Sequence, residues 1–216
     1  MTVQHNAAEI ADHLRKEIIL GKYERGDSLA EVTLAKQYNV SRGPIRDALT
    51  ILTAERMAEK RSNGRTVAIG YDIKGIRDLY EARILLETHA IRRMDSGLFA
   101  KYGSRLRDYI QLMENANDYE MRDIETDLSF HHLLMKMSGN ETLVHLWNTQ
   151  RSVFRTLVDI TSEVTFSSQD EIITQHIRLV EALEEGSPVL HQSCCRSIWK
   201  RRVSTAAGAK ACCERY

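Results

Sequence analysis

Cysteine is missing from most of this 216-residue sequence. Its four cysteines, Cys194, Cys195, Cys212 and Cys213, lie near the C-terminal end, so no disulfide framework is expected in the body of the chain. The sequence also lacks an apolar run of the roughly 20 residues that span a bilayer, and the basic, apolar and small-residue pattern of an export signal. These absences predict a cytoplasmic protein without a membrane segment.

Proline and glycine, which interrupt helices, are scarce. The sequence has two prolines, Pro44 and Pro188, and 11 glycines. Apolar residues make up 43% and charged residues 28%, as in globular proteins. Because long segments with helical apolar spacing dominate, the sequence predicts a mainly α-helical protein.

No excess charge of one sign is present, because 30 basic residues balance 30 acidic residues. This average hides three different parts. Residues 1–70 have 11 basic and 9 acidic side chains (net +2), and residues 71–190 have 13 and 20 (net −7). Residues 191–216 have 6 and 1 (net +5). We therefore expect a domain over 1–70, a second domain over 71–190, and an atypical Cys- and Arg-rich tail over 191–216.

The first part is predicted to hold three helices. Ile10, Leu14 and Ile18 recur at i, i+4 and i+8, which indicates an amphipathic helix over 8–20. A short helix is expected over 31–38. A third helix follows, and its core-facing stripe is Ile45, Ala48, Leu49 and Leu52.

The start of the third helix combines capping residues with arginines. Ser41 is a favourable N-cap, and Pro44 falls in the first turn, where a missing N–H costs little. Arg42 and Arg46 are one turn apart and project beside the apolar stripe.

A hairpin is predicted after the third helix. Asn63-Gly64 is a strong turn signal, because both residues tolerate the positive φ that a two-residue turn requires. Basic residues crowd its tip: Lys60, Arg61 and Arg65. Three helices followed by a basic hairpin predict an N-terminal winged helix-turn-helix. For the second part of the chain, the sequence predicts a C-terminal all-α helical bundle. One helix of this bundle is expected over 141–163.

This order of elements favours DNA binding. In a helix-turn-helix, the second helix of the motif enters the major groove, and here that is the third predicted helix. An Arg on it can bond guanine O6 and N7 together. A solvated basic face is the alternative, since the net charge alone decides nothing.

Polar residues interrupt the apolar faces of the second part. Asp127 and His131, at i and i+4, share a face with leucines, and His176 lies among apolar residues of a later helix. Buried polar groups without partners are costly, and carboxylate oxygen with imidazole nitrogen is a usual ligand set for zinc, nickel or manganese. The alternative is that they are hydrogen-bonded core residues.

Residues 8–70 resemble the winged-helix domain of the GntR transcription regulators. The resemblance rests on VSRGPIRDALTIL at 40–52 and NGRTVAI at 63–69. It implies that a homodimer binds a palindromic operator in double-stranded DNA. The implied DNA-binding residues are Thr33, Ser41, Arg42, Gly43, Arg46, Gly64 and Arg65.

Residues 72–186 resemble the FCD effector-binding domain of the FadR-type branch of these regulators. The motifs are LYEARILLE at 79–87, DLSFHHLLMKMSGN at 127–140 and QHIRLVEALEEG at 175–186. The stretch IRDLYEARILLETHA, taken with VSRGPIRDALTIL, is most similar to the gluconate-operon type of repressor.

The resemblance implies a divalent metal, zinc, nickel or manganese, held by Asp127, His131 and His176. It also implies a small carboxylic or sugar acid as effector. Arg83 is a candidate to bind the effector's carboxylate, and a salt bridge to Glu87, one turn away, is the equal alternative.

The C-terminal tail departs from the family pattern. The family's third His is expected at 196–198, where no histidine stands, and His191 comes too early. Either Cys194 or Cys195 replaces it as a ligand, or the tail is not the family's last helix, through an altered reading frame. A divergent helix over 190–207 is the alternative.

The sequence therefore predicts a bacterial transcriptional regulator, a repressor, that senses a small acid with a metal. A metal-dependent enzyme that uses Asp127, His131 and His176 is the alternative function. It lacks a convincing general base or nucleophile beside that site.

Overall fold

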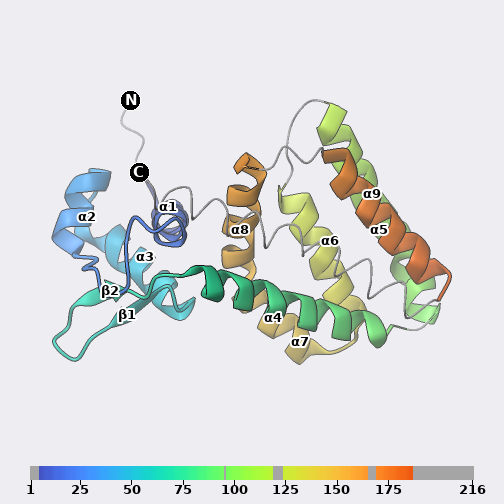
Figure 1. Ribbon diagram of the computed structural model, residues 1–216, viewed down its shortest axis with the longest axis horizontal. Helices are drawn as coiled ribbons and strands as arrows, with labels where there is room; N and C mark the ends of the chain where they lie inside the picture. Colours follow the sequence, from blue (N-terminus) through green and yellow to red (C-terminus); the bar gives the residue numbers. More distant parts are fainter. Residues whose placement is uncertain (1–4, 95, 119–123, 165–168, 187–216) are drawn as a thin grey trace. The chain divides into compact units, whose positions relative to one another are not determined.

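The computed structural model describes residues 5–94, 96–118, 124–164 and 169–186 (Figure 1). The described residues form two compact units, one up to Ile76 and the other from Arg77. The first unit contains α1 (Ala7–Ile19), α2 (Glu31–Tyr38), α3 (Arg42–Ala54), β1 (Ala58–Lys60) and β2 (Thr66–Ala68).

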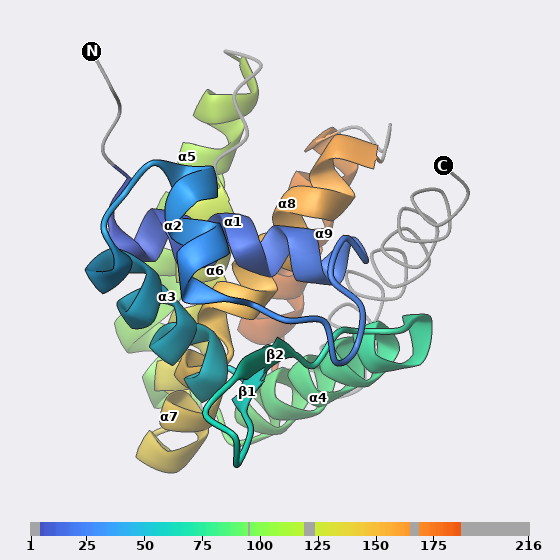
Figure 2. The same ribbon diagram turned by 90° about the vertical axis from the view of Figure 1, so that its left-hand side faces the viewer.

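The helix α1 begins with a reciprocal cap. The Asn6 side chain accepts a hydrogen bond from the Glu9 N–H at 3.0 Å, and the Glu9 carboxylate accepts one from the Asn6 N–H at 3.0 Å. The predicted stripe of Ile10, Leu14 and Ile18 is confirmed, since all three are fully buried. Through this stripe α1 packs against α3 (Figure 2).

The helix α3 confirms its predicted core face and corrects its predicted cap. The stripe Ile45, Ala48, Leu49 and Leu52 is buried. Ser41 occupies the N-cap position, but its side chain makes no capping hydrogen bond. A capping side chain bonds the N–H of the second or third helical residue. The third, Pro44, has no N–H, so only that of Gly43 is available to Ser41.

The hairpin forms, but its turn differs from the prediction. Strands β1 and β2 pair antiparallel, with Ala58 opposite Ala68 and Lys60 opposite Thr66. The Gly64 N–H donates to the Arg61 carbonyl at 2.9 Å, so the turn is longer than Asn63-Gly64. Gly64 alone in this turn has a left-handed φ, at 79°. The expectation of positive φ at both residues was therefore wrong.

Asn63 has a different role in the turn. Its side-chain oxygen accepts a hydrogen bond from the Arg65 N–H at 3.1 Å. An asparagine that bonds the backbone two residues on stabilises a turn without a left-handed φ of its own.

The second unit is a helical bundle, and its described residues contain no strand. Its helices are α4 (Ile73–Arg92, which begins in the first unit), α5 (Ser96–Asp118), α6 (Ile124–Met137), α7 (Glu141–Thr149), α8 (Arg151–Val164) and α9 (Gln169–Glu184). The helix α5 packs against α6 and α9, and α6 also contacts α7 and α8. The predicted fold class, mainly α with a winged helix-turn-helix, is confirmed.

The helix predicted over 141–163 is instead two helices, α7 and α8, separated at Gln150. The Asn140 side chain caps α7 by accepting from the Leu143 N–H at 3.2 Å. At the other end, the Thr149 hydroxyl donates to the Leu146 carbonyl at 2.7 Å. Asn and Thr are weak helix formers whose side chains compete for backbone groups, so α7 ends there.

Among the described residues, no helix combines the length and the apolar character needed to cross a membrane.

Candidate nucleic-acid interface and candidate metal centre

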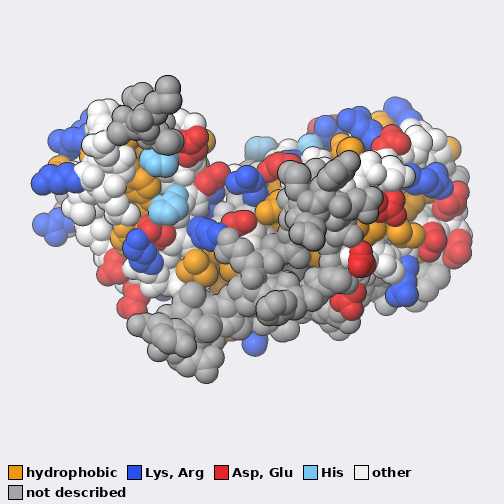
Figure 3. Space-filling model, turned by 90° about the horizontal axis from the view of Figure 1, so that it is seen from above, with side chains coloured by type: hydrophobic (Ala, Val, Ile, Leu, Met, Phe, Trp, Pro, Cys, Tyr) orange, Lys and Arg blue, Asp and Glu red, His pale blue; other side chains and the backbone are white. Residues whose placement is uncertain are grey.

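The predicted DNA-binding side chains are exposed in the first unit. They lie on α2, at the start of α3 and in the hairpin, and they are Thr33, Ser41, Arg42, Gly43, Arg46, Gly64 and Arg65. Lys and Arg side chains gather at this end of the unit in Figure 3. The face is therefore accessible and partly basic, as a phosphate-binding surface must be.

The two glycines of this face have different local causes. Gly64 has a φ of 79°, a conformation that disfavours any side chain, and a Cβ there would meet nothing within 4 Å. Gly43 lies in α3, and a Cβ would meet only the Ser41 hydroxyl, at 3.9 Å. Packing within the chain therefore does not require glycine at 43, which fits a need for close approach by a partner.

Glu31 joins the two arginines of α3, and sequence reasoning missed it. Its Oε2 accepts from Arg42 Nη2 at 2.9 Å and from Arg46 Nε at 2.8 Å. Hydrogen bonds from Arg46 and Arg42 hold the pKa of Glu31 below its usual range. Glu31 begins α2, so its proximity to α3 depends on how the two helices pack and follows no local spacing.

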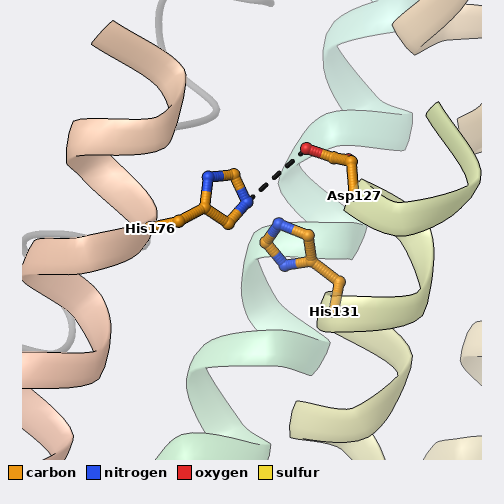
Figure 4. Close-up of side chains that lie close together, drawn as sticks. All are labelled: Asp127, His131 and His176. Atoms are coloured by element: carbon orange, nitrogen blue, oxygen red, sulfur yellow. Dashed lines mark ion pairs between the residues drawn. The ribbon is translucent and has the colours of Figure 1, made fainter. Parts of the chain in front are cut away.

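The three predicted metal ligands come together in the second unit. Asp127 and His131 lie on α6 and His176 on α9, and the side chains point toward one another (Figure 4). Each offers a ligand atom within 4.8 Å of the others. Asp127 is 5% exposed and both histidines are fully buried, so the prediction that these side chains point inward is confirmed.

The partners of His176 decide which of its nitrogens faces Asp127. His176 Nδ1 lies 2.7 Å from the Ile172 carbonyl oxygen. Because a carbonyl only accepts, Nδ1 carries the proton and Nε2 presents its lone pair. That Nε2 is 3.5 Å from Asp127 Oδ1. Two electron-rich atoms at this distance are stabilised by a cation between them, either a metal ion or a proton, so the donor set fits a divalent metal.

Glu87 on α4 is the buried centre of a second set of contacts. Its Oε1 accepts from Arg83 Nε at 2.7 Å and from Trp147 Nε1 at 3.1 Å. Its Oε2 lies 3.0 Å from His131 Nδ1. Burial raises the pKa of Glu87, but the charges and hydrogen bonds of His131 and Arg83 outweigh this, so the pKa is far below its usual range.

The sequence indicated only one of these contacts. The i, i+4 spacing of Arg83 and Glu87 pointed to their salt bridge, and the structure contains it. His131 and Trp147 are far from Glu87 in the chain, so no spacing pattern connects them.

Arg83 is buried beneath two aromatic rings. Its guanidinium lies 4.9 Å from the Phe154 ring centroid and 5.6 Å from that of Trp147. This environment has the positive charge that a carboxylate effector needs. Binding of an effector by Arg83 stays a prediction.

The predictions for the C-terminal tail lie outside the described residues. They concern 191–216, the expected third histidine at 196–198, His191, and replacement of that histidine by Cys194 or Cys195.

Two family profiles match this chain. "Bacterial regulatory proteins, gntR family" matches residues 6–67, and "FCD domain" matches residues 78–201. Together they cover both units.

Curated relatives match across these regions. The chain is 28% identical over 181 residues to the gluconate operon transcriptional repressor of Bacillus subtilis. This alignment covers 81% of this chain and 74% of the repressor. It is 31% identical over 132 residues to the Nta operon transcriptional regulator of Aminobacter aminovorans, and this alignment covers 61% of each protein.

Solved structures share the fold. One is that of Lar, described as controlling the expression of the Listeria monocytogenes agr system, with a TM-score of 0.66 and 20% identity over 95% of this chain and 98% of that one. Another is E. coli McbR/YncC, with a TM-score of 0.61 and 15% identity over 94% and 97%.

Proposed function

Because this chain belongs to the gntR family of bacterial regulatory proteins and carries an FCD domain, we propose a transcriptional repressor that responds to a small carboxylic or sugar acid at a divalent metal. The relatives are transcriptional regulators, so the chain is a regulator and the enzyme alternative is set aside. The observation that carries the sensing proposal is the buried convergence of Asp127, His131 and His176.

In the proposed mode of DNA binding, the N-terminal end of α3 enters the major groove of a palindromic operator. Arg42 and Arg46 are exposed on this helix and bring the guanidinium groups that read guanine. Arg65 beside the hairpin turn supplies a phosphate or groove contact. A homodimer would present two such units to the two half-sites, in the cytoplasm, where bacterial DNA lies.

In the proposed mode of sensing, Asp127, His131 and His176 hold a zinc, nickel or manganese ion. The bound ion supplies positive charge for an effector carboxylate. Arg83 supplies a second positive charge, which Glu87 balances when no effector is bound. Since effector and DNA sites are coupled in a repressor, each ligand must change the affinity of the other by the same factor.

A mobility-shift titration with DNA from the protein's own promoter region tests the DNA-binding proposal. Arg42→Gln and Arg46→Gln should each weaken specific binding by roughly 1–3 kcal/mol, as loss of a bidentate base contact does. The matched control is Arg56→Gln, which removes the same charge from just beyond the opposite end of α3. Equal losses in all three variants, or no shift at low salt, would reject the assigned interface.

Metal analysis of the purified protein tests the sensing proposal. We expect one divalent ion per chain and its loss from His176→Ala. A thermal-shift screen of carboxylic and sugar acids, with and without metal, then identifies the effector class, because a ligand of the folded state raises its stability. A metal-free wild type that no acid stabilises would contradict this part of the proposal.

A further inference from the structure

Glu87 occupies a position between the proposed metal ligand His131 and the rest of the core. It is fully buried on α4, whereas His131 is on α6 and Trp147 is on α7. The sequence-based ligand set does not contain it, and its Oε2 lies 3.0 Å from Nδ1 of His131, the ring nitrogen other than Nε2. Glu87 therefore contacts the ligand set through His131.

The charge of Glu87 and its distance from His131 Nδ1 favour one position for the proton of the His131 ring. An ionised carboxylate only accepts hydrogen bonds. At 3.0 Å from Glu87 Oε2, the Nδ1 of His131 therefore keeps its proton. The neutral ring then has its lone pair on Nε2, which is the atom left to face Asp127 and His176.

The other partners of Glu87 fix the carboxylate itself. Arg83 Nε and Trp147 Nε1 both donate to Oε1, and Oε2 is the oxygen that lies near His131 Nδ1. All four side chains are at most 1% exposed, so water does not compete for these contacts. The arrangement matches the carboxylate–histidine–metal pattern in which an outer carboxylate orients the ligand and sets its tautomer.

We infer that Glu87 is a positioning residue: held by Arg83 and Trp147, it fixes His131 in the tautomer and orientation that present Nε2 to the proposed metal. This inference rests on the proposed metal site and adds the residue that prepares it. It also gives Arg83 a defined role in the absence of effector, as the partner that orients Glu87.

The isosteric variant Glu87→Gln separates this role from simple packing. Arg83 and Trp147 are both donors, so the amide oxygen of Gln takes the Oε1 position and the amide NH₂ faces His131. The NH₂ donates to Nδ1, which must then accept, and the ring proton moves to Nε2. The shape of the core is kept while the metal-binding lone pair is removed. We expect metal affinity to fall by roughly 10–100-fold or more.

Two readouts on the full chain report this change. Competition with a chromophoric chelator gives the zinc affinity, and cobalt substitution gives a visible spectrum of the ligand field. Nitrogen chemical shifts of His131 in metal-free protein report its tautomer, which should change from the Nδ1-protonated to the Nε2-protonated form in Glu87→Gln. A role limited to packing would leave the tautomer unchanged.

Matched variants separate the possible causes. Glu55→Gln removes a carboxylate from another buried ion pair, in the first unit, and should leave metal affinity unchanged while lowering stability. In a His131→Ala background, Glu87→Gln should cause no further loss of affinity, because its effect passes through His131. Should Glu87→Gln fail to fold, Trp147→Phe, which removes one donor to Glu87, should still lower metal affinity measurably.

The outcomes distinguish this inference from the proposed function. If the wild type binds no metal, the metal proposal is overturned. The role of Glu87 is then still decided by comparing the His131 tautomer in the wild type and in Glu87→Gln. A wild type that binds metal, with unchanged affinity and unchanged tautomer in Glu87→Gln, overturns the inference alone.

Discussion

At the scale of single residues, Glu31 is an acidic side chain within the proposed DNA-binding face. An acidic group in a DNA-binding face repels phosphate. Here, its Oε2 brings the guanidiniums of Arg42 and Arg46 together. The carboxylate thus lowers the net charge of the face while it orients the two arginines.

We predict that Glu31→Gln raises affinity for nonspecific DNA and lowers the ratio of specific to nonspecific affinity several-fold. The added net charge strengthens phosphate binding, whereas the arginines lose their shared anchor. Fluorescence anisotropy with operator and scrambled duplexes at two salt concentrations measures the affinity for specific and for nonspecific DNA. Glu24→Gln, which removes a charge from an exposed turn, is the control, and an unchanged ratio would count against the anchor.

The pKa of Glu31 predicts how this anchor depends on pH. Because the pKa in the folded protein is lowered by Arg46 and Arg42, the anchor is present above the ordinary carboxyl pKa. It is lost only as the pH falls through the lowered value. Carbon NMR of the Glu31 carboxyl should therefore show a titration midpoint below that of exposed glutamates.

Gly43 offers a test in which stability and DNA binding should change in opposite directions. A Cβ there meets only the Ser41 hydroxyl at 3.9 Å, and Ala is favoured over Gly in helices by about 1 kcal/mol. We predict that Gly43→Ala leaves stability unchanged or raises it, while operator affinity falls, because the new methyl group obstructs close approach to phosphate. Thermal unfolding and the mobility-shift titration, done in parallel, check the two halves.

At the scale of elements, a buried ion pair fixes α1 to the end of α3. Arg15 Nε donates to Glu55 Oε2 at 2.7 Å and Arg15 Nη2 to Glu55 Oε1 at 2.9 Å. Both side chains are less than a tenth exposed. The pair therefore sets the position of the helix that carries Arg42 and Arg46.

We predict that Arg15→Met lowers the free energy of unfolding of the first unit by about 3–5 kcal/mol, because it leaves the buried Glu55 carboxylate without its guanidinium partner. Urea denaturation followed by circular dichroism measures the loss. Arg107→Ala breaks an exposed pair with Glu184 instead, and should cost at most about 1 kcal/mol. Similar losses of unfolding free energy for the buried and the exposed ion pair would contradict this prediction.

The elements also show how much of the fold was available from local sequence. Spacing of apolar residues predicted the buried faces of α1 and α3, since residues three and four apart share one face of a helix. Apolar spacing also predicted a single helix in place of α7 and α8. The break between them is made by polar residues, Asn148, Thr149 and Gln150, which the apolar pattern does not detect. The sequence-based prediction also assigned to Ser41 a capping hydrogen bond that the structure does not contain.

At the scale of the whole molecule, the proposed metal should stabilise the second unit. We predict that a chelator lowers the melting temperature of the wild type but not that of His176→Ala. At a free metal concentration about 100 times Kd, the stabilisation amounts to roughly 2.7 kcal/mol. Differential scanning calorimetry with and without chelator measures it. Equal shifts in both proteins would assign the effect to another site.

The sequence by itself determined the partition of charge, the buried faces of helices and the inward direction of Asp127, His131 and His176, because each depends on spacing within one segment. Tertiary structure alone decided that Glu87 meets His131 and Trp147, and that Glu31 meets Arg42 and Arg46. These contacts join different helices. They depend on which helix faces pack together, and that is settled by burial of the whole core rather than by any local pattern.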